Sequence, residues 1–180
     1  MSGTELRIPT LETERLVLRA PRAGDFEAYA EFRTGPRAAY SGGPYTRAQA
    51  FEQFCALAGH WLVRGYGRWL VATRAEDRPI GIVGLYYPED WLEPEVAWAL
   101  FDGAEGHGYA EEAARAALRY AYDTLGWTTL VSLIGPDNAR SAALAARLGA
   151  TREGVYHHAS LGPLDVWRHP GPGAAAGEVA

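Results

Sequence analysis

The chain has 180 residues, 48% of them hydrophobic, which suits one domain with a substantial core and leaves little room for a second. Its net charge is −5, and all 17 of its positively charged residues are arginines spread along the chain, which argues against nucleic acid as a partner. The absence of lysine excludes a P-loop, a Schiff-base enzyme and a pyridoxal-phosphate site, since each depends on a lysine amine.

The first part of the chain predicts one strand and two helices. A β-favouring run at residues 15–19 predicts the first strand. Apolar residues then recur at helical spacing from Asp25, and Thr46 with Gln49 forms a capping box ahead of a second amphipathic helix. Between the helices, residues 34–45 are rich in Gly, Pro and Tyr, a composition typical of a mobile loop that could cover a site.

The rest of the chain predicts a hairpin, four more strands and two helices. The hairpin strands are residues 69–73 and 80–86, around a polar turn. A long alanine-rich helix follows, from residue 110 to 125. Further strands are expected at residues 95–101, 128–134, 151–157 and 164–168, and a helix at 137–148. Residues 1–169 should form the single domain, and residues 170–180 a disordered tail.

The most informative segment is a glycine-rich loop that opens the alanine-rich helix. It consists of Gly106, His107, Gly108, Tyr109 and Ala110. Glycines let the backbone approach a ligand closely, and the unpaired amides at a helix start favour an anion such as pyrophosphate. Such a turn can also serve only as a tight helix entry.

A dinucleotide-binding turn of an oxidoreductase domain is a further alternative for this loop. Asp137, after the next strand, resembles the acidic residue that holds a ribose there. Against this alternative, Glu111 occupies the third glycine position of that motif, and antiparallel strands precede the loop.

Asn138 and Ser141 form a second polar group, three residues apart on one face of a first helical turn. Two interpretations are open. Asp137 or Asn138 caps the helix and Ser141 is an ordinary first-turn residue, or the pair contacts a ligand.

Together these segments resemble the GNAT acyltransferases, and among them the ribosomal-protein-alanine N-acetyltransferases. The resemblance covers about residues 8–168. Residues 11–19 (Leu-Glu-Thr-Glu-Arg-Leu-Val-Leu-Arg) resemble the opening strand of that branch, residues 80–84 its central hairpin and residues 95–98 its fourth strand. Residues 106–113 are similar to its acetyl-CoA pyrophosphate loop, and residues 138–141 with Leu148-Gly149 to the helix beside the pantetheine.

The resemblance implies a mixed α/β fold, with a mostly antiparallel sheet of about six or seven strands, splayed in the middle and flanked by about four helices. Main-chain groups of Trp98, Ala99 and Leu100 would then line a slot for the pantetheine, with Asn138 and Ser141 opposite. The implied reaction moves an acetyl group from acetyl-CoA to a primary amine, on a protein N-terminus or a small molecule. A non-catalytic acyl-CoA sensor or assembly module is the alternative.

The resemblance also suggests two catalytic residues. Glu95 is similar to the glutamate that begins the fourth strand in this branch, and strand alternation places it on the same face as Ala97 and Ala99, so it is a candidate base; a solvent-facing strand glutamate is the alternative. Ser141 is expected near the sulfur, where its hydroxyl could protonate the departing thiolate. One departure is Glu105, at a loop position that is Gln or Arg in the family, because a carboxylate should repel a pyrophosphate unless its side chain turns away.

The remaining features of the sequence concern location, metal binding and the acceptor. No secretory signal or membrane-length apolar run is visible, so we expect a cytoplasmic protein with no membrane partner. No metal site is expected, because His157 and His158 point to opposite faces of a strand, and Cys55 and His60 diverge on a helix. Most of the tryptophans and tyrosines are expected in the core, and Trp91 suits an acceptor pocket or a homodimer contact instead. The acidic net charge mildly favours cationic acceptors.

Overall fold

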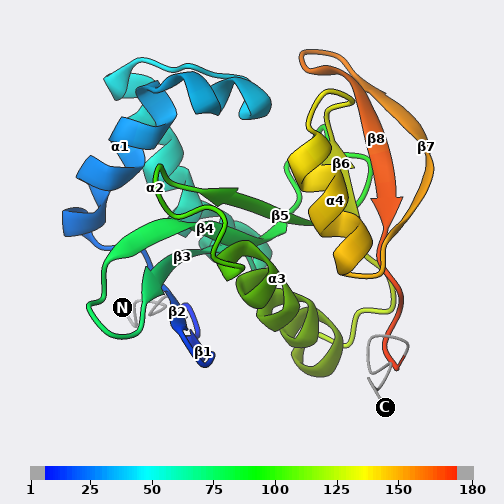
Figure 1. Cartoon of the computed structure of the whole chain (residues 1–180), viewed down its shortest axis with the longest axis horizontal. Coiled ribbons are helices and arrows are strands. Elements are labelled where there is room, and N and C mark those ends of the chain that lie inside the picture. The colour runs from blue at the N-terminus through cyan, green and yellow to red at the C-terminus, as the bar shows by residue number, and fades with distance from the viewer. Residues whose placement is uncertain (1–6, 174–180) are drawn as a thin grey trace, which may run out of the picture.

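The computed structural model describes residues 7–173 and places eight strands in one sheet (Figure 1). The strands are β1 (Leu11–Glu12), β2 (Leu16–Arg19), β3 (Arg68–Thr73), β4 (Pro79–Tyr86), β5 (Glu95–Leu100), β6 (Val131–Ile134), β7 (Thr151–His158) and β8 (Gly162–Arg168). Their order across the sheet is β1-β2-β3-β4-β5-β6-β8-β7, and every neighbouring pair is antiparallel except β5 and β6. The mixed α/β, mostly antiparallel fold is therefore confirmed. The sheet has more strands than the six or seven expected, because β1 has only two residues, too few to form a sequence pattern.

Four α-helices flank the sheet: α1 (Phe26–Thr34), α2 (Arg47–Arg64), α3 (Tyr109–Arg119) and α4 (Ala139–Arg147). Apolar side chains of α1 and α2 pack with Leu70, Ile82 and Phe101 in one cluster. The alanines of α3 pack with Trp69, Val71 and other residues of the opposite face in a second cluster. Because β3 and β4 are covered on both faces, their sequences are continuous apolar runs that do not alternate with polar residues.

Helix boundaries follow local chemistry. The predicted capping box at the start of α2 is confirmed: the Gln49 amide donates to Thr46 Oγ1 at 3.2 Å, and the Thr46 amide donates to the Gln49 side chain at 2.9 Å. The helix ends at Gly65, whose φ of 77° lies in the left-handed region. After α3 the predicted long helix continues only as a short π-helix, Tyr120–Thr124.

The segment expected to be a mobile loop has regular structure. Residues Pro36–Ser41 form a 3₁₀ helix, and Arg33 Nη1 donates to Ser41 Oγ at 2.7 Å, which ties this helix to α1. Most of the tail predicted at residues 170–180 lies outside the described residues.

The feature that creates a site is the fork between β5 and β6. These parallel strands pair at a single position, Glu95 with Val131, whereas β4 and β5 pair at six positions. Figure 1 shows β6, β8, β7 and α4 diverging from the rest of the sheet beyond this junction. The expected splay in the middle of the sheet is thus confirmed.

Candidate active site

The fork opens into a cavity of about 790 Å³. Five of the predicted site residues line it: Glu95, Trp98, Ala99, Asn138 and Ser141. The side chain of Leu100 does not, because it packs in the core against the α3 side of the sheet. The glycine-rich loop lies outside this lining, at the start of α3.

Glu95 stands where the two strands part, and its side chain is buried, with 5% of the residue exposed. The backbone N–H of Leu133, on β6, donates to Glu95 Oε2 at 2.9 Å. Burial raises the pKa of Glu95 to about 7, because a carboxylate loses its hydration there; the Leu133 amide, the charge of Arg68 and the Trp91 indole lower it by less. This carboxyl therefore gains and loses a proton near neutral pH, and it is not a solvent-facing strand glutamate.

The two glycines of the loop both have left-handed backbones, with φ of 80° at Gly106 and 77° at Gly108. A Cβ on Gly106 would meet no atom within 4 Å, so space lies beside the backbone there. Gly108 is the N-cap of α3 and supplies no side-chain cap to the first amides of that helix. These amides, with the positive end of the helix dipole, form a cradle suited to an anion.

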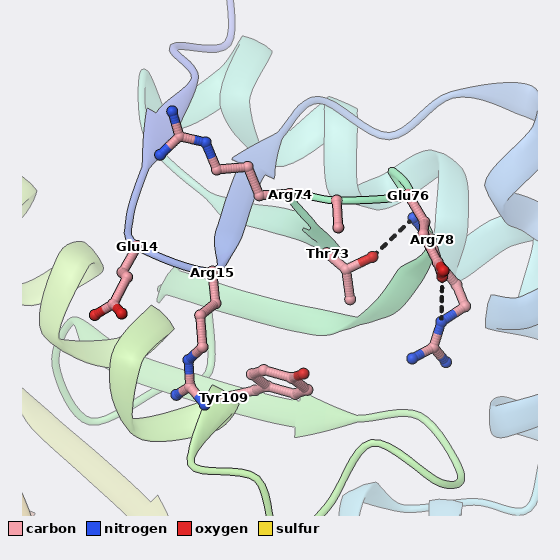
Figure 2. A pocket seen from close by; sticks show the side chains of 8 residues that line it. Glu14, Arg15, Thr73, Arg74, Glu76, Arg78 and Tyr109 are labelled. Carbon is pink, nitrogen blue, oxygen red and sulfur yellow. Dashed lines mark hydrogen bonds and ion pairs between the residues drawn. The ribbon is translucent and has the colours of Figure 1, made fainter.

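Arg15 fixes this loop in place, a role that the sequence did not indicate. Its guanidinium donates to the His107 carbonyl at 2.8 Å and to Glu112 at 2.7 Å, and it lies 4.9 Å from the centre of the Tyr109 ring. Figure 2 shows the Arg15 side chain reaching toward Tyr109, and both residues line a cavity of about 520 Å³. No residue lines both this cavity and the one in the fork.

The polar group at the start of α4 confirms the helix cap, and its contact with a ligand stays a prediction. Asn138 Oδ1 accepts from the Ser141 amide at 3.2 Å and so caps the helix. Ser141 is nevertheless more than a first-turn residue, because its Oγ accepts from the Trp98 indole N–H at 3.2 Å and faces the cavity. The Ser141 hydroxyl proton itself makes no hydrogen bond within residues 7–173, so it can be donated into the cavity.

Glu105 does not face the loop as an isolated charge. Its carboxylate pairs with Arg37 and lies 3.8 Å from the guanidinium of Arg140, in the first turn of α4. Arg37 also pairs with Asp102 at 2.8 Å. The side chain therefore turns toward arginines, and its negative charge is compensated where the sequence raised the question of repulsion.

A buried histidine behind the fork was not foreseen. The Ser132 hydroxyl donates its proton to the Val96 carbonyl at 2.7 Å. Ser132 Oγ lies 2.9 Å from His169 Nε2 and can therefore only accept there, so the proton of the His169 ring is on Nε2. His169 is 2% exposed, and its Nδ1 makes no hydrogen bond with any described residue. Burial lowers the pKa of His169 to about 4, so the ring is neutral at pH 7. A lone histidine in a C-terminal segment gives no sequence signal for this role.

The expectations for metal and membrane can be compared with the described residues. Residues 7–173 contain no group of three or more His, Cys, Asp or Glu side chains that could hold a metal ion. None of the helices in this range is both long and apolar enough to cross a bilayer. Trp91 lines the cavity in the fork, as one of its two interpretations requires.

Comparison with known proteins places this geometry in a family. Residues 15–151 match the model of the acetyltransferase (GNAT) domain. The chain is 26% identical over 165 residues to the uncharacterized N-acetyltransferase YoaA of Bacillus subtilis, covering 88% of this chain and 93% of that protein. Its structure is similar to that of an acetyltransferase from Agrobacterium tumefaciens, with a TM-score of 0.84, 37% identity, and 94% and 98% of the two chains covered.

The fold is also shared with RimL, a ribosomal L7/L12 alpha-N-protein acetyltransferase solved in complex with coenzyme A, at a TM-score of 0.71 and 16% identity, covering 90% of this chain and 98% of that one. The antiparallel strands before the loop also differ from the parallel sheet of a dinucleotide-binding domain. The family match spans most of the chain, and the chain belongs to the GNAT acetyltransferases.

Proposed function

We propose that the protein moves an acetyl group from acetyl-CoA to a primary amine, on a small molecule or a peptide N-terminus, by direct attack of the amine on the thioester. The observation that carries this proposal is Glu95, a buried carboxyl that titrates near neutral pH inside the fork between β5 and β6. A general base is needed because the amine arrives protonated and must lose a proton before it can attack.

The chain offers a fitting place for acetyl-CoA. Gly106 and Gly108 leave the space and the amides that a pyrophosphate requires, and the cavity beyond provides unpaired strand edges for the pantetheine amides. When bound, acetyl-CoA supplies an acetyl group activated as a thioester, and coenzyme A leaves as the thiol once the amide has formed. RimL, which shares this fold, binds coenzyme A, and this supports the same cosubstrate here.

Glu95 would accept the proton of the acceptor ammonium, directly or through a water. Ala97 and Ala99 follow it on the same face of β5, and their small side chains leave room for an acceptor. With a pKa of about 7, roughly half of the Glu95 carboxyls are ionised at pH 7, which is close to the optimum for a base that must also release its proton.

Ser141 would relay the second proton: its hydroxyl gives a proton to the sulfur that leaves and regains one from the attacking nitrogen, which must lose a proton as the amide forms. The Trp98 indole N–H occupies one acceptor site of the hydroxyl and thereby orients its O–H bond. Backbone amides along the open edge of β5 would polarise the thioester carbonyl, and such a donor is worth on the order of 10² to 10³ in rate.

Two measurements test this proposal. Calorimetry with coenzyme A should show saturable binding, and a thiol assay with acetyl-CoA and a panel of amines should show release of the thiol that depends on the amine. Binding of coenzyme A without turnover of any amine would favour an acyl-CoA sensor. Absence of coenzyme A binding by a folded protein would contradict the proposal altogether.

A further inference from the structure

The cavity in the fork is lined by two arginines that pair with no carboxylate among residues 7–173, although the chain as a whole is acidic. Its ionisable lining consists of three arginines, three carboxylic acids and two histidines: Arg33, Arg64, Arg68, Glu89, Asp90, Glu95, His60 and His158. Arg64 pairs with Glu89 at 3.1 Å, at the rim. His60 accepts a hydrogen bond from a backbone amide at one ring nitrogen and contacts a backbone carbonyl at the other, so the ring is neutral and both nitrogens have partners.

Asp90 lies beside His158. The Nδ1 atom of His158 accepts two backbone amides, each at 3.1 Å, so its proton is on Nε2, which lies 3.0 Å from Asp90 Oδ2. Arg64 has Glu89 as its partner, whereas Arg33 and Arg68 are the two arginines of this lining with no carboxylate partner among the described residues.

Arg33 is the more buried of the two arginines, with 7% of the residue exposed. Its Nε and Nη2 both donate to Gln53 Oε1, and Nη1 donates to Ser41 Oγ, so its hydrogen-bond partners are neutral. Its guanidinium also lies 4.5 Å from the centre of the Tyr45 ring. Within residues 7–173 no carboxylate pairs with it. A buried cation without a counter-ion is costly, and an anion that enters the cavity would relieve that cost.

Arg68 is held only by stacking. Its guanidinium lies 4.1 Å from the centre of the Tyr86 ring, and its side chain makes no hydrogen bond or ion pair with another described residue. Strand register places Arg68 beside Gly84 and Tyr86 beside Glu95, so Arg68 and Glu95 lie on the same face of the sheet. Two strand spacings across and two residues along separate their Cα atoms by roughly 12 Å, which is short enough for both long side chains to contact one small molecule.

We propose that the acceptor is an amino carboxylate, a small molecule whose primary amine and carboxylate are both bound in this cavity. The inference rests on the proposed function: the amine lies at Glu95, while the carboxylate lies at Arg68 and adds its charge to the field of Arg33. Guanidinium groups suit this role, because their planar fork matches a carboxylate with two parallel hydrogen bonds. Since Arg33 is enclosed, the anionic end must belong to a small or narrow molecule.

This assignment is opposite to what the net charge of the chain favours. The distant surface carboxylates are screened by water and salt over about 10 Å, whereas the two arginines line the cavity itself. The local charge therefore decides which acceptor is held.

The test compares free amino acids with their carboxamides, which have the same size and the same amine but no negative charge. With the wild-type protein and acetyl-CoA, we expect kcat/KM for the acid to exceed that for the carboxamide by at least about tenfold. Arg68→Gln should lower kcat/KM for the acid by about 10- to 100-fold, mainly through KM, and kcat/KM for the carboxamide by a much smaller factor, because Arg68 also lowers the pKa of Glu95. Arg33→Lys, which keeps the positive charge through which Arg33 acts, should lower kcat/KM for the acid by a smaller factor.

Arg47→Gln is the matched control. Arg47 also stacks on an aromatic ring, 5.0 Å from the centre of Phe26, and pairs with an exposed carboxylate, but it lies outside the cavity. Arg47→Gln should leave kcat/KM unchanged for both the acid and the carboxamide. Equal rates for acid and carboxamide in the wild type, or an equal loss of both in Arg68→Gln, would overturn the inference.

A panel of further amines separates this inference from the proposed function on which it rests. If cationic amines and carboxamides react as fast as amino acids, the acetyltransferase proposal stands and the amino carboxylate is wrong. If no amine in the panel releases the thiol, the proposed function itself fails. Peptides with glutamate after the N-terminal residue test a carboxylate from a second source, and a preference for them over free amino acids would overturn the small-molecule assignment.

Discussion

Replacement of Glu95 by glutamine separates catalysis from folding, because the two should change in opposite directions. Glutamine keeps the shape of the side chain and can still accept the Leu133 N–H, but it has no basic lone pair to take a proton. A general base contributes about 10²- to 10⁴-fold, so we expect kcat/KM at pH 7 to fall by at least roughly tenfold, with the affinity for coenzyme A unchanged.

The dependence on pH gives the sharper signature. Because the pKa of Glu95 is about 7, wild-type kcat/KM should rise with pH between about 6 and 8 and then level off. The variant depends on acceptor that is already neutral, a fraction that grows about 100-fold between pH 7 and 9 for an amine with a pKa near 10. The deficit of the variant should therefore shrink at alkaline pH. A deficit that stays constant would mean that Glu95 positions substrate, and no deficit would remove it from the mechanism.

Stability should respond with the opposite sign. The pKa of Glu95 is raised from 4.5 in the unfolded chain to about 7 in the folded protein, so the folded state binds more protons between these values. The stability that this provides is fully present below pH 4.5 and is lost as pH rises through 7, a change of about 3 kcal/mol. Glu95→Gln should thus be at least as stable as wild type at pH 8 in urea melts. The exposed Glu76→Gln serves as a control that alters neither activity nor stability.

Three further outcomes follow from the geometry of the loop and the buried histidine. Gly108→Asp should abolish coenzyme A binding, since it places a negative charge beside the pyrophosphate and a side chain where φ is 77°; unchanged affinity in calorimetry of the folded variant would refute the loop assignment. Glu105→Gln should bind coenzyme A as well or more tightly, because it releases Arg37 and Arg140 from their carboxylate, and clearly weaker binding would identify Glu105 as a structural anchor. The pKa of His169 is lowered to about 4, so its contribution to folding stability, about 3 kcal/mol, is complete above pH 6.5 and lost as pH falls through 4. His169→Gln should remove this loss of stability in acid, which urea melts at pH 7 and at pH 4 would show.

Much of the fold could be predicted from the sequence because its signals are local. The Thr46 capping box and the alanine stripe that becomes α3 each report the conformation of their own segment. The limits of β6 could not be read in this way. Residues 128–130 have the composition of a strand but lie outside β6, because pairing begins only at Val131, where β8 supplies the partner.

The candidate site was predictable where residues act through their backbone and not where distant side chains meet. The glycines of the loop indicate a backbone role directly, because a residue without Cβ lets the chain adopt a positive φ and approach a ligand closely. In contrast, Arg15 reaches His107 over 92 positions of sequence, and Ser132 meets His169 over 37, so no spacing rule could have joined them. The environment of Glu105 was hidden for the same reason, because Arg37 comes from a segment that looked like an unstructured loop.

The hydrogen bond from Leu133 to Glu95 links the proton on the carboxyl to the shape of the fork. It joins β5 to β6 just beyond their only paired position, so it helps to set the angle at which the two halves of the sheet separate. An ionised carboxylate accepts such a bond about twice as strongly as a neutral one. Protonation of Glu95 should therefore weaken the hydrogen bond that joins β5 to β6 at the fork, and loss of the proton should strengthen it.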